Sequence, residues 1–222
     1  MIPLYDTLRP RRFAFITWAL IALNALVFYH ELTLGNAGLE RFIRTWGLIP
    51  SNLARHPDTA WLTLFSSMFI HGGWFHLLSN MWVLFIFGDN IEDRLGSLRY
   101  LFFYLLSGLA AALMQVYILK DNNMPMVGAS GAIAGVLGAY LVLFPRARVA
   151  SLVPILFIFT IVELPAVIFL AFWFISQLFS GLFLLNGGTD SGIAWWAHIG
   201  GFVFGMAAGL LLAPRRPSYS SI

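Results

Sequence analysis

The sequence predicts an all-α membrane protein with six transmembrane helices. Two observations support this class. Of the 222 residues, 59% are hydrophobic and only 10% are charged, whereas a soluble domain carries about 25% charged residues. The hydrophobic residues also gather into apolar segments, most of them long enough to cross the roughly 30 Å hydrocarbon core of a bilayer. We therefore expect one polytopic domain over residues 1–222, with its core at about 13–213 and nearly all of it in the lipid bilayer.

Hydrophobic runs define the six predicted helices. In chain order they lie at about Phe13–Tyr29, Trp74–Ile91, Leu98–Leu119, Ser130–Phe144, Leu164–Leu184 and Ile193–Ala213. The region 149–185 is too long for one span, so we expect the segment Val153–Thr160 to lie at the membrane interface. The long loop between the first two helices carries charged residues together with Trp46 and Trp61. This mixture predicts that the loop lies on or in the membrane surface.

Positive charges predict the orientation. On the side of both termini lie nine cations, Arg9, Arg11, Arg12, Arg94, Arg99, Arg146, Arg148, Arg215 and Arg216. On the other side lie four, Arg41, Arg44, Arg55 and Lys120. The positive-inside rule then places both termini in the cytoplasm. The net charge of +3 sits at helix ends, so it indicates topology rather than nucleic-acid binding.

The amino-terminal region suggests a cellular location. Its first apolar run has no small-residue cleavage site, so we expect no signal peptide. Together with the topology and the lack of a transit peptide, this predicts a bacterial plasma (inner) membrane, with an organelle inner membrane as the alternative.

The residue types present also limit the chemistry. The chain contains no cysteine, which excludes a thiol nucleophile, disulfides and cysteine-ligated metal. No HExxH motif occurs, and His71 and His76 are five residues apart, which places them on different faces of a helix. We therefore expect neither a metal nor another cofactor.

Four polar residues from three predicted helices share one depth. Ser130, His198 and His76 stand 15, 16 and 13 residues from Pro145, Pro214 and Asp89, which mark the inner ends of their helices. At 1.5 Å per residue these separations are about 22, 24 and 20 Å. Asn80 lies one turn from His76 on the same face. The helical rise thus predicts one polar layer near the outer face of the membrane.

This set of residues suits acyl-transfer chemistry. A serine hydroxyl is a weak nucleophile until a base removes its proton, and neutral histidine is the usual base. The oxyanion that forms next needs fixed donors, which His76, Asn80 and the Ser130 N–H at a helix start can supply. No Asp or Glu lies near His198 apart from Asp190 in the preceding loop. We therefore expect a Ser130–His198 dyad without a carboxylate.

Each of these residues also has a structural interpretation. A serine in a membrane helix usually bonds its own backbone or a neighbouring helix, and an asparagine often joins two helices. His76 could lie at the interface and His198 could be a packed polar residue, although intramembrane histidines are costly and usually functional. Their common depth is what favours the catalytic interpretation.

Small residues predict that the fourth and sixth helices lie in contact. Glycines recur every fourth residue in the sixth helix, and the fourth helix is also rich in them. Small residues allow helix backbones to approach closely, although such patterns are common in membrane helices. The glycines are Gly201, Gly205 and Gly209 in the sixth helix and Gly131, Gly135 and Gly138 in the fourth.

Three motifs resemble those of the rhomboid intramembrane serine proteases. They are GASG at Gly128–Gly131, HxxxN at His76–Asn80, and AHIGG at Ala197–Gly201. The resemblance implies a six-helix rhomboid fold that cleaves transmembrane substrates near their outer ends. It implies Ser130 as nucleophile, His198 as base, and His76 and Asn80 in the oxyanion hole. Gly128 would permit a close approach beside the nucleophile, and Glu92–Gly96 resembles a structural ExxxG motif in which Glu92 and Arg94 have structural roles.

The chain departs from the family pattern at two positions. Ala134 stands where some members carry an aromatic residue against the catalytic histidine, so His198 must be supported differently. Ser79 stands where some carry a bulky aromatic at the gate for substrates. The gate is then either looser or built from helix-five aromatics, although lipid-facing bulk explains them equally well. Those aromatics are Phe172, Trp173 and Phe174. The nearby Gln177 is polar and could face a water-filled cavity, but the sequence assigns it no role.

Three function classes follow. The first is an intramembrane protease whose partners are single-pass or polytopic membrane proteins and the lipid bilayer, without metal or nucleic acid. The second is a non-catalytic protein that uses the same fold to bind membrane helices, which normally would have lost the nucleophile or the base. The third is a small channel or transporter, disfavoured because the inner half of the helices is almost wholly apolar.

Overall fold

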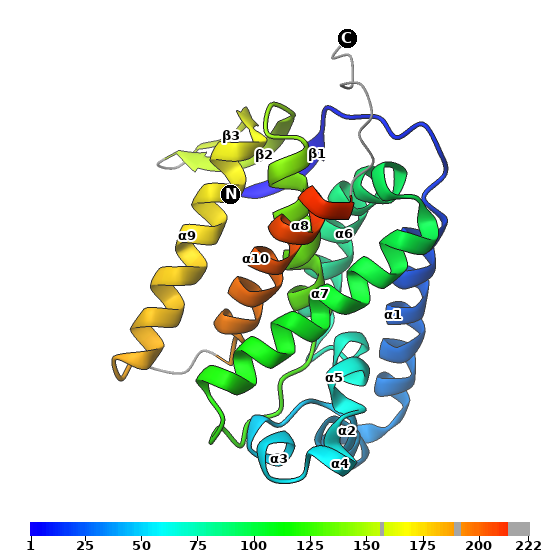
Figure 1. Ribbon diagram of the computed structural model, residues 1–222, viewed down its shortest axis with the longest axis vertical. Coiled ribbons are helices and arrows are strands. Elements are labelled where there is room, and N and C mark those ends of the chain that lie inside the picture. Colours follow the sequence, from blue (N-terminus) through cyan, green and yellow to red (C-terminus); the bar gives the residue numbers. More distant parts are fainter. Residues whose placement is uncertain (156–157, 189–191, 213–222) are drawn as a thin grey trace.

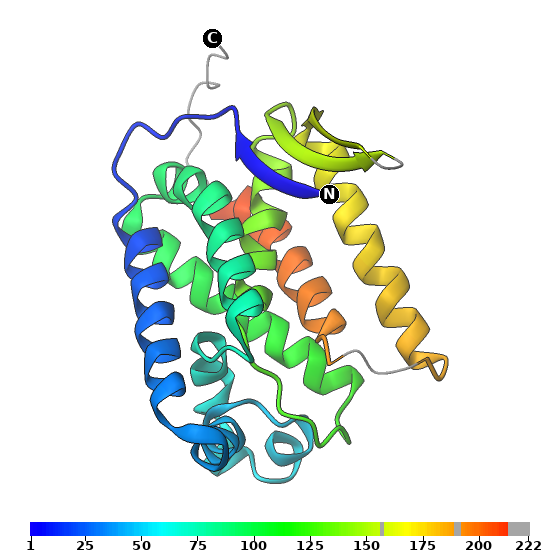
Figure 2. The ribbon, with the colours of Figure 1, turned by 180° about the vertical axis from the view of Figure 1, so that it is seen from behind.

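Helices make up most of the chain in the computed structural model, which describes residues 1–155, 158–188 and 192–212. A helix forms at each of the six apolar segments. These helices are α1 (Phe15–Thr33), α6 (Trp74–Leu95), α7 (Ser97–Ile118), α8 (Ser130–Leu143), α9 (Ala166–Leu185) and α10 (Trp195–Leu212). They pack side by side, with α8 in the middle and α9 at one edge of the bundle (Figures 1 and 2). The residues Asp190, Ala213, Pro214, Arg215 and Arg216, to which the sequence predictions referred, lie outside the described ranges.

Length and composition mark fewer membrane spans than the six predicted. Within the described residues, α1, α7, α9 and α10 are long and apolar enough to cross a bilayer. A fifth candidate is a broken span, in which the segment Thr63–Phe69 meets α6 at an angle of 94°. Helix α8 is apolar but has only 14 residues. The protein is thus a multi-pass membrane protein with four or five candidate spans.

The loop between α1 and α6 is folded into short helices at one end of the bundle (Figure 1). The first of them, α2, combines charged and apolar residues, as a segment at a membrane surface would. The others are one or two turns long. The elements are α2 (Gly35–Trp46), α3 (Pro50–Arg55), α4 (Pro57–Ala60), α5 (Thr63–Ser66) and the 3₁₀ helix η1 (Ser67–Phe69).

The opposite end of the bundle carries a β-sheet, so the expectation of an all-α fold is wrong. Strands β1 (Ile2–Asp6), β2 (Arg148–Ile155) and β3 (Ile158–Pro165) form an antiparallel sheet in the order β1-β2-β3. The segment Val153–Thr160, predicted to be interfacial, therefore belongs to a β-hairpin as far as it is described. Its run of β-branched and aromatic residues favours extended backbone. The strand ends at Pro165, so the fifth helix begins at Ala166 rather than Leu164.

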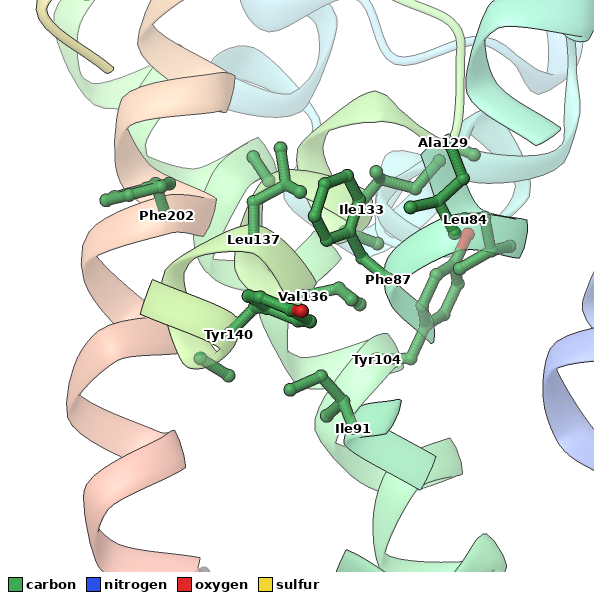
Figure 3. Packing of buried hydrophobic residues seen from close by; sticks show 14 of the residues in the cluster. Leu84, Phe87, Ile91, Tyr104, Ala129, Ile133, Val136, Leu137, Tyr140 and Phe202 are labelled. Carbon is green, nitrogen blue, oxygen red and sulfur yellow. The ribbon is translucent and has the colours of Figure 1, made fainter. Parts of the chain in front are cut away.

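The core of the bundle is built around α8. Every residue of this helix from Gly131 to Tyr140 is buried. Figure 3 shows Ile133, Leu137 and Tyr140 of α8 facing Phe87 and other side chains of the neighbouring helices. The ring of Tyr140 meets that of Phe87 edge-on, with centroids 4.9 Å apart. This packing fixes the position of α8, and with it the residue at its first turn.

A buried carboxylate joins the helix ends on the sheet side. Glu92 accepts hydrogen bonds from the backbone N–H groups of Ile16 (2.9 Å) and Thr17 (2.8 Å) and from the Ser97 hydroxyl (2.6 Å). It therefore satisfies donors at the first turns of both α1 and α7. Gly96 ends α6 with a φ of +82°, a conformation that favours glycine.

Candidate active site

Ser130 is the first residue of α8, and the turn that leads into this helix contains a glycine. Gly128 has a φ of +122°, which side chains rarely tolerate. Its N–H is anchored to the Ser67 carbonyl oxygen at 2.9 Å. A Cβ atom added at Gly128 would lie 2.6 Å from His76 Nε2. A side chain at position 128 would overlap the His76 ring, so this turn requires glycine.

Glycines bring α10 into backbone contact with α8. A Cβ added at Gly201 or Gly205 would clash with the carbonyl oxygens of Gly131 and Gly135 respectively. Because the backbones touch, His198 of α10 reaches the first turn of α8. Its Nε2 lies 2.8 Å from Ser130 Oγ, which is hydrogen-bonding distance.

Helix α9 and the first residue of α10 supply further neighbours of His198. Gln177 Oε1 lies 2.8 Å from His198 Nδ1. This contact was not predicted, although a polar side chain in an otherwise apolar helix pointed to a special role for Gln177. The Trp173 ring lies 5.9 Å from the imidazole, and Trp195 of α10 approaches it edge-on at 6.1 Å. Ala134 is fully buried. The groups that support the histidine therefore lie on α9 and at the start of α10, while position 134 of α8 offers only a buried methyl group.

The three aromatics considered for the gate separate into two groups. The rings of Trp173 and Phe174 pack against Phe202 of α10, at 5.8 and 4.6 Å. Phe172 instead is 60% exposed on the outside of the bundle. An exposed aromatic suits contact with lipid acyl chains, so only Trp173 and Phe174 lie on the α9–α10 contact.

His76 and Asn80 face Ser130 and His198 across one cavity. The cavity measures about 480 Å³ and all four side chains line it. Asn80 is buried, and its Nδ2 donates one hydrogen bond to the His76 carbonyl oxygen at 2.9 Å. The second N–H of that amide is left for other acceptors. His76 Nδ1 accepts a long hydrogen bond from the Gly72 N–H at 3.4 Å, which makes Nε2 the donor nitrogen.

A second buried glutamine holds the start of α10. Gln115 of α7 accepts the Ala197 N–H at 3.1 Å through its Oε1 and also lines the cavity. Gln115 was not among the predicted site residues, because nothing in the sequence shows which way α7 faces. Among the described residues no group of three or more His, Cys, Asp or Glu could hold a metal ion.

This fold and this site define a class: polytopic membrane proteins that keep a serine–histidine pair beside a cavity within a helix bundle. The chain belongs to the rhomboid family, because the family model described as "Rhomboid domain" matches residues 58–215. It is 29% identical over 200 residues to "Rhomboid protein 1, mitochondrial" of Saccharomyces cerevisiae, covering 87% of this chain and 52% of that protein. It is 34% identical over 165 residues to "RHOMBOID-like protein 4" of Arabidopsis thaliana, covering 74% of this chain and 37% of that protein.

The similarity covers only part of the length of each relative. A third relative, "RHOMBOID-like protein 6, mitochondrial" of Arabidopsis thaliana, is 31% identical over 155 residues, which cover 70% of this chain and 45% of that protein. The chain thus spans about half the length, or less, of these relatives. The comparisons therefore show the family, and the activity of this chain is a matter of proposal.

Proposed function

We propose that the protein is an intramembrane serine endopeptidase that hydrolyses peptide bonds of transmembrane substrates near their outer ends. The observation that carries the proposal is the 2.8 Å contact between His198 Nε2 and Ser130 Oγ. Membership of the rhomboid family supports it. The cavity is large enough for several side chains of an unwound substrate segment and for the water that hydrolysis consumes.

The reaction follows from the donors and acceptors around Ser130. Oγ attacks the scissile carbonyl carbon while His198 Nε2 takes its proton, and the carbonyl oxygen becomes an oxyanion. His76 Nε2–H, the free Asn80 N–H and the Ser130 backbone N–H stabilise that charge. The protonated His198 then gives its proton to the leaving amine as the C–N bond breaks. Water, deprotonated by His198, releases the acyl group and restores the Ser130 hydroxyl.

The orientation in the membrane belongs to the same proposal. Six membrane crossings, with α8 as a short span, would leave both termini in the cytoplasm, as the distribution of arginines favours. The sheet would then lie at the cytoplasmic side and the cavity near the outer side. We propose a bacterial plasma membrane as the location, although two of the relatives named above are called mitochondrial.

Fluorophosphonate labelling of purified protein in detergent tests the proposal. The wild type should be labelled, and Ser130→Ala and His198→Ala should each lose both labelling and cleavage of a helix-destabilised transmembrane substrate. His56→Ala, which changes an exposed histidine, should leave both intact.

Either of two results would contradict the assignment. Full activity of Ser130→Ala would exclude Ser130 as the nucleophile. A folded wild type that neither reacts nor cleaves would instead favour a non-catalytic protein that binds membrane helices.

A further inference from the structure

Gln177 is a buried amide in the middle of the apolar helix α9. Burying an amide in a membrane costs free energy unless its donors and acceptor are satisfied. Its Oε1 meets His198 Nδ1 at 2.8 Å. Among the described residues no carboxylate lies within hydrogen-bonding distance of this histidine, so the amide takes the place that an acid occupies in a Ser-His-Asp triad.

The neighbours of the amide fix which end faces the histidine. The Ser176 hydroxyl donates to the Trp173 carbonyl oxygen at 2.6 Å, so its oxygen is free to accept. Gln177 Nε2 lies 3.0 Å from that oxygen and 3.3 Å from the Trp173 carbonyl oxygen. Both neighbours are acceptors, and only the NH₂ end of the amide satisfies them. The oxygen must therefore point at His198.

An oxygen at this place determines the tautomer of the imidazole. Oε1 can only accept, so the proton must sit on His198 Nδ1. The lone pair then lies on Nε2, which is 2.8 Å from Ser130 Oγ and able to take its proton. With the opposite tautomer, Nε2 would carry the proton and could not act as the base.

We propose that Gln177 is a positioning residue, which holds His198 in the Nδ1–H tautomer and aims Nε2 at Ser130. The proposal rests on the roles proposed above for Ser130 and His198. It has a structural consequence, because Gln177 and Trp173 both come from α9 while Ser130 and His198 come from α8 and α10. The base is therefore held only while α9 stays packed against α10 at this level.

Two variants separate positioning from packing. Gln177→Met keeps the length and volume of the side chain but removes the acceptor, whereas Gln177→Glu keeps an acceptor oxygen with the same reach. Ser180→Ala is the matched control, since it removes a polar group one turn further along α9 that does not line the cavity. All are compared with the wild type in detergent, with folding checked by thermal unfolding.

The first measurement is made without substrate. In protein labelled with ¹⁵N at histidine, the His198 signals, assigned with His198→Ala, report the tautomer directly. We expect the Nδ1–H form in the wild type, Gln177→Glu and Ser180→Ala, and a mixture of tautomers in Gln177→Met. A pure Nδ1–H form in Gln177→Met, or the Nε2–H form in the wild type, would overturn the proposal.

The second measurement is turnover of a transmembrane substrate. We expect kcat of Gln177→Met to fall about 10- to 100-fold with KM unchanged, less than the roughly 10⁴-fold loss for a wrong tautomer in a serine protease triad, because the correct tautomer stays accessible. Gln177→Glu should stay within a few-fold of the wild type. Wild-type kcat in Gln177→Met would mean that the residue only packs, and equal losses in both variants would mean that the acceptor oxygen is not what supports His198; either result would overturn the proposal. If the wild type shows the Nδ1–H tautomer but no reaction at Ser130, the proposed function fails while the positioning role stands.

Discussion

At the scale of residues, the proposed oxyanion hole depends on groups that are already partly engaged. Asn80 Nδ2 donates one hydrogen bond to the His76 carbonyl oxygen, which orients the amide. The His76 ring is held between the Gly72 N–H and the Gly128 turn. Donors that are fixed before the reaction pay no reorganisation cost when the negative charge develops. Their contribution should therefore appear in the chemical step.

Replacement of Asn80 tests this contribution. Asn80→Ala should lower kcat by about 10²–10³-fold with little change in KM, because one preorganised oxyanion donor is worth about 2.7–4 kcal/mol. Steady-state cleavage of a transmembrane substrate measures both constants. Leu78→Ala, on the exposed face of the same turn, serves as the control. A kcat within fivefold of the wild type in folded Asn80→Ala would remove this residue from the oxyanion hole.

The sequence predicted one layer for Ser130 and three polar partners but assigned no role to Gln177 or Gln115, and the reason is geometric. Helical rise converts residue numbers into depth, so Ser130, His198, His76 and Asn80 could be assigned to one layer. Depth alone does not say which way a helix faces. Gln177 faces His198 because α9 packs with Trp173 and Phe174 against α10, and this rotation depends on tertiary contacts that are not local in sequence.

At the scale of elements, the contact between α8 and α10 positions the nucleophile and the base. The two helices meet through Gly201 and Gly205, where any side chain would clash with the facing backbone. The 2.8 Å contact between Ser130 Oγ and His198 Nε2 therefore depends on the lack of side chains at Gly201 and Gly205. The glycine pattern predicted this proximity, since small residues are what helices in a membrane use to approach.

A larger residue in this contact should separate the pair. Gly205→Val places a branched side chain against the Gly135 carbonyl oxygen, and overpacking of this kind typically costs about 1–3 kcal/mol or more. We expect a lower unfolding temperature and a fluorophosphonate labelling rate at least tenfold slower. Ala207→Val places the same side chain on the exposed face of α10 and should change neither measurement. Wild-type labelling by Gly205→Val would show that the glycine contact does not position Ser130.

Helices were predicted well at this scale and strands were not. An apolar run long enough to cross a membrane usually forms an α-helix, because a helix satisfies the hydrogen bonds of its own backbone. The stretch Arg148–Pro165 is also apolar, and its pairing cannot be read locally. Strand β2 bonds to β1, whose residues precede it by more than 140 positions in the chain. No periodicity near Val153 reveals that partner.

At the scale of the whole molecule, the amino-terminal strand joins the sheet to the bundle. Asp6, at the end of β1, accepts hydrogen bonds from the Tyr140 hydroxyl of α8 and from Asn90 Nδ2 of α6, the latter at 3.0 Å. The Trp82 indole donates to the Pro3 carbonyl oxygen at 2.7 Å. Strand β3 continues directly into α9. The sheet therefore connects the helix that carries Gln177 with the helices that carry Ser130 and Asn80.

Asp6 makes this connection sensitive to pH. Burial raises the pKa of the Asp6 carboxyl from 3.8 to about 7, and the nearby Asp89 adds to the increase, while the Tyr140 hydroxyl opposes it. The folded protein thus holds a proton on Asp6 between about pH 4 and pH 7 that the unfolded chain releases. Folding stability contributed by this group is complete below pH 4 and is lost as the pH rises through 7, because the unfolded state binds fewer protons over this interval.

Replacing Asp6 with its neutral analogue should remove that pH dependence. Asp6→Asn keeps an oxygen that can accept from Tyr140 but carries no charge at any pH. We therefore expect the unfolding temperature of the wild type in detergent to fall between pH 4.5 and 8 relative to that of Asp6→Asn, with the two closest at the acidic end. Asp58→Asn, at an exposed carboxylate, should follow the wild type throughout. Parallel curves for the wild type and Asp6→Asn would mean that Asp6 is already ionised in the folded protein. In that case the strand is held to α6 and α8 by a charged carboxylate, and stability should instead be lost on acidification.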